Sequence, residues 1–171
     1  MKTARSYASK SILFIVVSTM LLTSCKTEIS TPKGSSGAVK EDHQKTTLSI
    51  DHPEQNAMVP LAVTVTGSSR DIPDNRKIWI VVFPLMANSY YPQDRSADLQ
   101  ADGKWASVAY IGEKNKNTGE QFDIIAVLVD ANAEMQFRNY IQRSKNTNSY
   151  PGLGSLPQGV EIYSRITVQR Q

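Results

Sequence analysis

The chain has 171 residues, 40% of them hydrophobic, and carries a formal net charge of +3 with a single cysteine. Lys2, Arg5 and Lys10 account for all of this net charge, because the 16 other basic residues balance the 16 acidic residues. Such a balance gives no general attraction for nucleic acid, and the interspersed charges are typical of a solvated surface. The composition therefore excludes nucleic acid as an expected partner.

The first 24 residues have the pattern of an export signal. Residues 1–10 are basic without an acidic residue, and an almost wholly apolar run follows from Ile12 to Leu22. A transmembrane anchor is the alternative, but spanning a bilayer takes about 20 apolar residues and this run has roughly half that number. We therefore favour a cleaved signal peptide over residues 1–24.

The end of this segment, Leu22-Thr23-Ser24-Cys25, is similar to the lipobox of bacterial lipoproteins. In that family the thiol receives a diacylglyceryl group, the signal is cut just before the cysteine, and the new amino terminus is usually acylated. The resemblance implies that Cys25 is lipidated and holds the protein to a membrane, since two or three acyl chains anchor firmly. The alternative is a chance cysteine within an ordinary secretory signal.

The resemblance also implies a location in the cell envelope. Lys26 follows the cysteine, and in lipoprotein sorting a residue other than Asp here favours the outer membrane. The expected location is thus the outer membrane where the organism has one, and otherwise the outer face of the cell membrane. Since lipidation consumes the only thiol, the folded part has no disulfide, zinc–cysteine site or cysteine nucleophile.

Residues 25–45 are expected to be the lipidated cysteine and a flexible tether. They are rich in Ser, Thr, Lys, Gly and Glu and have few large apolar side chains. Such a segment cannot bury enough surface to offset its ordering entropy. We expect it to space the domain from the membrane.

From residue 46 the pattern changes to short β-strands separated by turns. In the second strand Leu61, Val63 and Val65 alternate with threonines, which predicts one face toward a core. The segment 77–83 is apolar on both faces, which indicates a central strand that is covered on both sides. Strands are expected over residues 47–51, 61–67, 77–83, 104–111, 121–130 and 161–168.

One helix is expected after the strand at 121–130. Its apolar stripe consists of Ala133, Phe137, Tyr140 and Ile141. Asp130 or Asn132 can cap its start, and Glu134 and Arg138 form a stabilising pair one turn apart. We expect a short helix that covers one end of the sheet core.

Together these elements predict an all-β domain over residues 46–171, with the helix as an insertion. About seven short strands over roughly 125 residues are typical of one antiparallel two-sheet sandwich. A domain of this length can bury a self-sufficient core.

Several short motifs stand in or beside the expected strands. They are IDHPEQNAMVP at 50–60, TVTG at 64–67, KIWIVVFP at 77–84, YYPQD at 90–94, DGKW at 102–105, YIG at 110–112, FDIIAVLVD at 122–130, LPQGV at 156–160 and the final ITVQR. With these motifs the chain resembles a group of bacterial immunoglobulin-like domains found on exported and cell-surface proteins. The resemblance covers roughly residues 46–170 and implies an immunoglobulin-like β-sandwich. It implies no defined activity, because a fold does not imply a function.

Motifs for catalysis and metal binding are missing from the sequence. No GxSxG, SxxK, HExxH or P-loop pattern occurs. His52 with Asp51 and Glu54 is a possible metal set, but neighbouring positions of a strand point to opposite faces. Asp71 and Asp74 offer oxygens for calcium, which needs six to eight of them. We therefore expect no catalytic residue, no metal and no cofactor.

Aromatic side chains remain as candidates for recognition. We expect Trp79 and Trp105 to pack inside, since Trp on a central strand of a sandwich is usually part of the core. Tyr90 and Tyr91, at a junction between strand and loop, are expected to be exposed and to contact a partner together with Tyr150. A planar row of exposed rings would favour a glycan, whereas buried rings with a flat polar surface would favour a protein partner.

The sequence as a whole predicts a lipoprotein that the lipid on Cys25 holds to the membrane and that carries a non-catalytic binding domain. Its expected partner is an envelope protein or a glycan. A glycan- or peptidoglycan-binding module is the first alternative. An envelope hydrolase is the second, and nothing in the sequence favours it.

Overall fold

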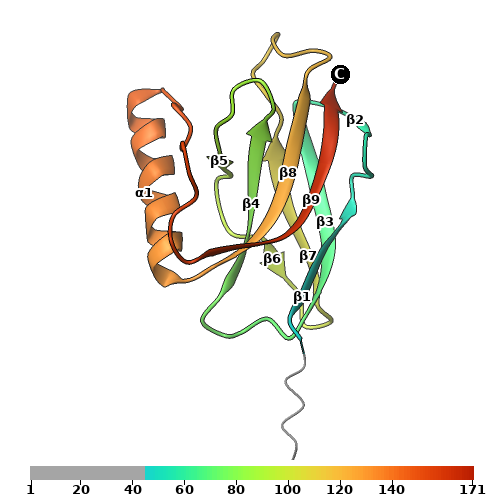
Figure 1. Ribbon diagram of the computed structural model, residues 1–171, viewed down its shortest axis with the longest axis vertical. Coiled ribbons are helices and arrows are strands. Elements are labelled where there is room, and N and C mark those ends of the chain that lie inside the picture. Colours follow the sequence, from blue (N-terminus) through green and yellow to red (C-terminus); the bar gives the residue numbers. More distant parts are fainter. Residues whose placement is uncertain (1–44) are drawn as a thin grey trace, which may run out of the picture. The chain divides into compact units, whose positions relative to one another are not determined.

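The structure is a computed structural model that describes residues 45–171 (Figure 1). The expected signal peptide, the lipidation site Cys25 and the tether up to residue 44 lie outside the described residues. Among the described residues, no helix is both long and apolar enough to cross a membrane.

Within the described residues the chain forms nine strands and one helix. The six strands expected from alternation are all present near their expected positions, and three strands of two residues each add to them. In chain order the elements are β1 (Thr47–His52), β2 (Met58–Val59), β3 (Ala62–Arg70), β4 (Lys77–Pro84), β5 (Tyr91–Pro92), β6 (Asp98–Leu99), β7 (Lys104–Tyr110), β8 (Gln121–Val129), α1 (Ala131–Thr147) and β9 (Val160–Arg170).

The strands form two sheets. One has the order β1-β3-β7-β6, and the other has the order β2-β9-β8-β4-β5. Neighbouring strands run antiparallel, except that β2 runs parallel to β9. The expectation of a mostly β fold with two sheets and one helix is confirmed, although the arrangement is not wholly antiparallel.

The two sheets enclose an apolar cluster, which we call the inter-sheet core. Inward-facing residues of β3, β4, β7 and β8 fill it, as the alternation along these strands predicts. Val65 is completely buried here, and Trp105 is 1% exposed, which confirms its expected interior position. The largest fully buried members are Trp105, Phe122, Ile80, Ile111 and Ile124.

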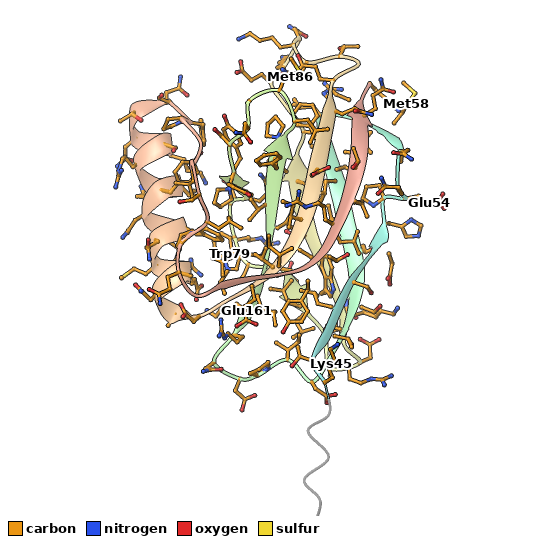
Figure 2. All side chains as sticks on the ribbon, viewed as in Figure 1. Lys45, Glu54, Met58, Trp79, Met86 and Glu161 are labelled. Carbon is orange, nitrogen blue, oxygen red and sulfur yellow. The ribbon has the colours of Figure 1, made fainter. Side chains whose placement is uncertain are left out.

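A second apolar cluster, the helix-side core, lies between α1 and the outer face of the five-stranded sheet. It contains Trp79, which is completely buried and meets the ring of Phe137 edge-on with a centroid distance of 5.3 Å. Figure 2 shows Trp79 on the side of the sheet that faces the helix. The strand β4 therefore supplies alternate residues to two cores, as its apolar character on both faces predicts.

The position of α1 corrects the expectation that the helix covers one end of the sheet core. It packs instead against the outer face of the five-stranded sheet, through the helix-side core, and Figure 1 shows it on the side of β4 and β5. The reason is that Trp79, Val81, Ile125 and Val127 point outward from β4 and β8 and need cover. A local sequence pattern does not indicate which surface an amphipathic helix will cover.

The helix itself begins and ends where its sequence predicts. The carboxylate of Asp130 accepts a hydrogen bond from the Ala133 amide at 2.8 Å and so caps the first turn. Asn148 ends the helix in the left-handed conformation with φ 48°. The expected apolar stripe is buried against the sheet.

Candidate functional site

The segment that connects α1 to β9 is the starting point of the site. Residues 148–159 run back alongside the helix before the chain enters β9 (Figure 1). On the way they meet the residue before β5, because Tyr90 and Leu153 exchange two backbone hydrogen bonds of 2.8 Å each. This bridge brings together the two segments that carry the three tyrosines expected to contact a partner.

Tyr90 and Tyr91 are half-buried rather than exposed on a loop, which corrects the expectation for these two rings. Tyr90 packs in the helix-side core, with its ring centroid 4.8 Å from that of Phe83. Tyr91 belongs to β5 and packs against the inter-sheet core. Since neighbouring residues of a strand point to opposite faces, these two rings do not form one contact surface.

Gly152 allows the connecting segment to lie close to β5. A Cβ at this position would fall 2.8 Å from Cβ of Ser89 and 2.9 Å from Cζ of Tyr91. The residue also has φ +72°, a backbone conformation that residues with a side chain rarely adopt. Glycine therefore meets both the steric and the conformational requirement of this crossing.

Tyr140 of α1 lies next to the same crossing. Burial raises the pKa of its phenol above the ordinary value of 10, while the nearby Ser144 side chain and Gly152 backbone oppose the rise. Neither of these two neighbours meets the geometry of a hydrogen bond, so the buried hydroxyl has no partner among the described groups. The negative forms of the Tyr91 and Tyr150 phenols would raise this pKa further, which places all three phenols in one neighbourhood.

Tyr150 is the exposed member of the expected trio. Its side chain is 49% exposed, at the start of the connecting segment. The structure thus gathers the three expected tyrosines around one crossing, but only Tyr150 is exposed, at about half of its surface.

A hollow of about 330 Å³ lies between α1 and the connecting segment. Leu153 and Pro157 provide its apolar lining. The polar lining consists of Gln136, Asn139, Tyr140, Arg143 and Ser155. We call this feature the α1 hollow.

Four of the five polar residues of the α1 hollow are exposed, and Tyr140 is buried. Over residues 45–171, none of the five donates or accepts a hydrogen bond through its side chain, and Arg143 forms no salt bridge. Neighbouring charged side chains behave differently, since Lys145 pairs with Asp94 at 3.1 Å. Within the described domain, the polar groups of the hollow other than Tyr140 are therefore open to solvent and available to a ligand.

A second hollow, of about 210 Å³, lies beside β7 and includes Asp94, Arg95 and Tyr110 in its lining. Its charged groups are already engaged: Arg95 binds Asp98 at 2.8 Å, and Asp94 binds Lys145. It therefore offers a ligand fewer free partners than the α1 hollow does.

Gln93 is a buried polar residue that the sequence gives no reason to select. Its Oε1 accepts a hydrogen bond from the Tyr110 amide at 2.8 Å, and its Nε2 donates to the Tyr91 carbonyl at 2.9 Å. These bonds join the edge of one sheet to β7 of the other. Gln93 thus holds the neighbourhood of β5 in place.

Asp123 is a second buried polar residue that sequence reasoning missed. Its carboxylate accepts hydrogen bonds from Thr167 at 2.8 Å and from Arg165 at 3.1 Å, and the Arg165 guanidinium lies 5.9 Å from the centroid of the Phe83 ring. An acidic residue inside the apolar run FDIIAV is the signal that could have revealed it. Because both carboxylate oxygens have partners, the arrangement stabilises the sheet face.

Acidic and histidine side chains form no metal-binding cluster in the described domain. Residues 45–171 contain no group of three or more His, Cys, Asp or Glu side chains that could hold a metal ion. Asp51, part of the metal set considered from the sequence, forms a salt bridge with Lys104 at 3.4 Å.

The fold and the site define a class of protein: a β-rich domain of two sheets, with one helix on an outer face and a polar hollow beside that helix. No protein-family model matches the chain, and no curated protein matches it either.

Proposed function

We propose that this chain is a lipid-anchored protein of the cell envelope and that residues 46–171 are a non-catalytic recognition domain. The anchor rests on the lipobox-like Leu22-Thr23-Ser24-Cys25 and the export signal before it. The recognition role rests on the α1 hollow, where polar side chains converge without partners in the described domain. A lipid anchor and a tether raise the local concentration of such a domain near its partners.

The strand order supports an immunoglobulin-like assignment of this domain. In that fold, strands A, B, E and D form one sheet and strands C, F and G form the other. With β2 and β5 set aside and the two-residue strand β6 kept as strand D, the sheets here have the orders A-B-E-D and G-F-C. In this scheme α1 and the connecting segment lie between strands F and G, a connection that contributes to binding in variable domains.

A protein or peptide is the partner that the burial pattern favours over an extended glycan. A planar row of exposed rings formed by Trp79, Tyr90, Tyr91 and Trp105 would have favoured a glycan. Both indoles are buried, at 0% and 1% exposed, and the rings of Tyr90 and Tyr91 are half-buried. These positions leave no such row among these four side chains.

The anchor is tested by a Cys25→Ser substitution in the full chain. We expect loss of incorporated fatty acid and either release of the protein into a soluble fraction or accumulation of the uncleaved precursor. A Ser36→Ala substitution in the tether is the matched control and should leave both properties unchanged. Normal processing and membrane retention of the Cys25→Ser protein would contradict the lipoprotein assignment.

The recognition role is tested by blocking the α1 hollow. Asn139→Trp places a large ring in the hollow, and Asn132→Trp makes the same change at an exposed helix position outside its lining. Capture of a partner from envelope extract should be lost with Asn139→Trp and kept with Asn132→Trp, and sedimentation with peptidoglycan run in parallel identifies a glycan partner. Equal capture by both variants would show that recognition does not use the hollow.

A further inference from the structure

We infer that the α1 hollow binds a peptide through its terminal carboxylate, with Arg143 as the group that holds the charge. The inference rests on the proposed recognition role and gives that role a class of ligand. Three features of the hollow carry it: one cation without a salt bridge within residues 45–171, a row of neutral polar groups, and an apolar lining.

The first feature is the electrostatics of the lining. Arg143 is the only charged residue among the described residues that line the hollow, and no carboxylate lies within salt-bridge distance of it there. A guanidinium presents parallel donors that match the two oxygens of a carboxylate. Its single charge suits a carboxylate better than a phosphate group, which carries about −1.5 to −2 at neutral pH.

The second feature is the arrangement of the neutral groups. Gln136, Asn139, Tyr140 and Arg143 have the spacing i, i+3, i+4 and i+7, which places them along one face of α1. The two amide side chains each offer a donor and an acceptor, as a peptide bond does. A carboxylate bound at Arg143 would therefore have amide partners along the same helix face, one and two turns before it.

The third feature is the opposite wall of the hollow. Leu153 and Pro157 are half-buried residues of the connecting segment that face the helical row across the hollow. They provide apolar contact for a small side chain, and Ser155 between them adds a hydroxyl. A volume of about 330 Å³ is near the lower limit for pockets that hold a small ligand, which suits the last one or two residues of a peptide.

The test uses ligand-observed NMR titration of the full lipidated chain in detergent micelles. The probes are N-acetyl-L-alanyl-L-alanine, N-acetyl-D-alanyl-D-alanine and the C-terminal amide of each. We expect saturable binding of an acid and binding of its amide that is about 10- to 100-fold weaker, because a hydrogen bond to a charged group is worth about 1.5–3 kcal/mol. Preference for the L form indicates a protein C-terminus, and preference for the D form indicates a cell-wall stem peptide.

Two variants assign the interaction to Arg143. Arg143→Gln should weaken binding of the acid by about 10- to 100-fold and leave the weak binding of the amide unchanged. Arg70→Gln makes the same change in net charge at the exposed end of β3 and should have no effect. Thermal unfolding of both variants should match the unsubstituted chain, because both side chains are exposed.

Three results would overturn the inference. They are equal binding of acid and amide, equal effects of the two arginine variants, and no binding of any probe. The anchor and the partner capture are measured separately with Cys25→Ser and Asn139→Trp. A recognition domain that captures its partner through the hollow but ignores terminal carboxylates would therefore be recognised as such.

Discussion

The indole of Trp105 lies directly against the α-carbon of Gly67 on the neighbouring strand. A Cβ at Gly67 would overlap with Cζ2 and Cε2 of this ring and with the carbonyl oxygen of Ser49 on β1. Gly67 and Trp105 are also paired in the register between β3 and β7. The largest side chain of the inter-sheet core therefore depends on the smallest residue of the strand beside it.

Gly67→Ala should consequently destabilise the domain. Overpacking of a closely packed core costs about 1–3 kcal/mol, and contact with backbone as well as with the ring places this substitution at the upper end of that range. Urea unfolding followed by tryptophan fluorescence measures the change. Gly154→Ala is the matched control, since a Cβ there meets nothing within 4 Å and the free energy of unfolding should change by less than about 0.5 kcal/mol.

Phe137→Ala should weaken the attachment of α1 to the sheet. The ring of Phe137 is completely buried against Trp79, and loss of a buried Phe side chain costs about 3–5 kcal/mol. Met135→Ala on the same helix removes a side chain that is 54% exposed and should have little effect. Similar unfolding midpoints in urea for both variants would contradict the assignment of α1 to the helix-side core.

Glu134 should make stability depend on acid pH. Burial raises the pKa of its carboxyl, but hydrogen bonds from Lys77 and Arg138 outweigh burial and bring the pKa below the ordinary 4.5. A lowered pKa in the folded state stabilises the fold above pH 4.5, and this contribution disappears as the pH falls through the folded-state pKa.

Glu134→Gln should therefore lower the free energy of unfolding by about 1–2 kcal/mol at pH 7 and by almost nothing near pH 2. Thermal unfolding across this range measures the difference. Glu113→Gln is the control, because the pair of Glu113 with Lys116 is exposed and surface pairs contribute little. A difference that stays constant down to pH 2 would rule out the ionised carboxylate as its source.

Tyr140 should have the opposite dependence, at alkaline pH. Burial raises the pKa of its phenol in the folded state. The stability linked to the protonated phenol is therefore complete below pH 10 and is lost as the pH rises through the folded-state pKa. Tyr140→Phe removes a buried hydroxyl without a partner, and it should leave stability at pH 7 unchanged or raise it by up to about 1 kcal/mol. It should also reduce the loss of stability at alkaline pH, whereas Tyr150→Phe, at an exposed position, should not. If the free energy of unfolding of the two variants depended equally on alkaline pH, this role of Tyr140 would be contradicted.

Much of the fold could be predicted from the sequence because short-range periodicity reports it. Alternation along 61–67 reveals an inward face, and apolar residues at helical spacing reveal the buried side of α1. The cap at Asp130 follows from the same local pattern. The burial of Trp79 and Trp105 follows from their positions within strongly β-prone runs.

The candidate site was less predictable. The sequence predicts that Tyr90 and Tyr91 are exposed and contact a partner together with Tyr150, and the structure does gather their segments through the bridge between Tyr90 and Leu153. Exposure itself depends on what packs against each ring, and of the three only Tyr150 is exposed. The polar row that ends at Arg143 was visible at helical spacing beside the apolar stripe, but its significance depends on the segment opposite.

Local sequence patterns predict the order and approximate extent of the main strands and the helix, since these depend on residues close together in the chain. Three features follow only from long-range packing: α1 covers the outer face of a sheet, Asp123 meets Arg165 and Thr167, and residues 153–157 close a hollow against the helix. These contacts join residues that are far apart in the chain. Each depends on which apolar surface is left uncovered once the sheets have formed, and that is a property of the whole packed domain.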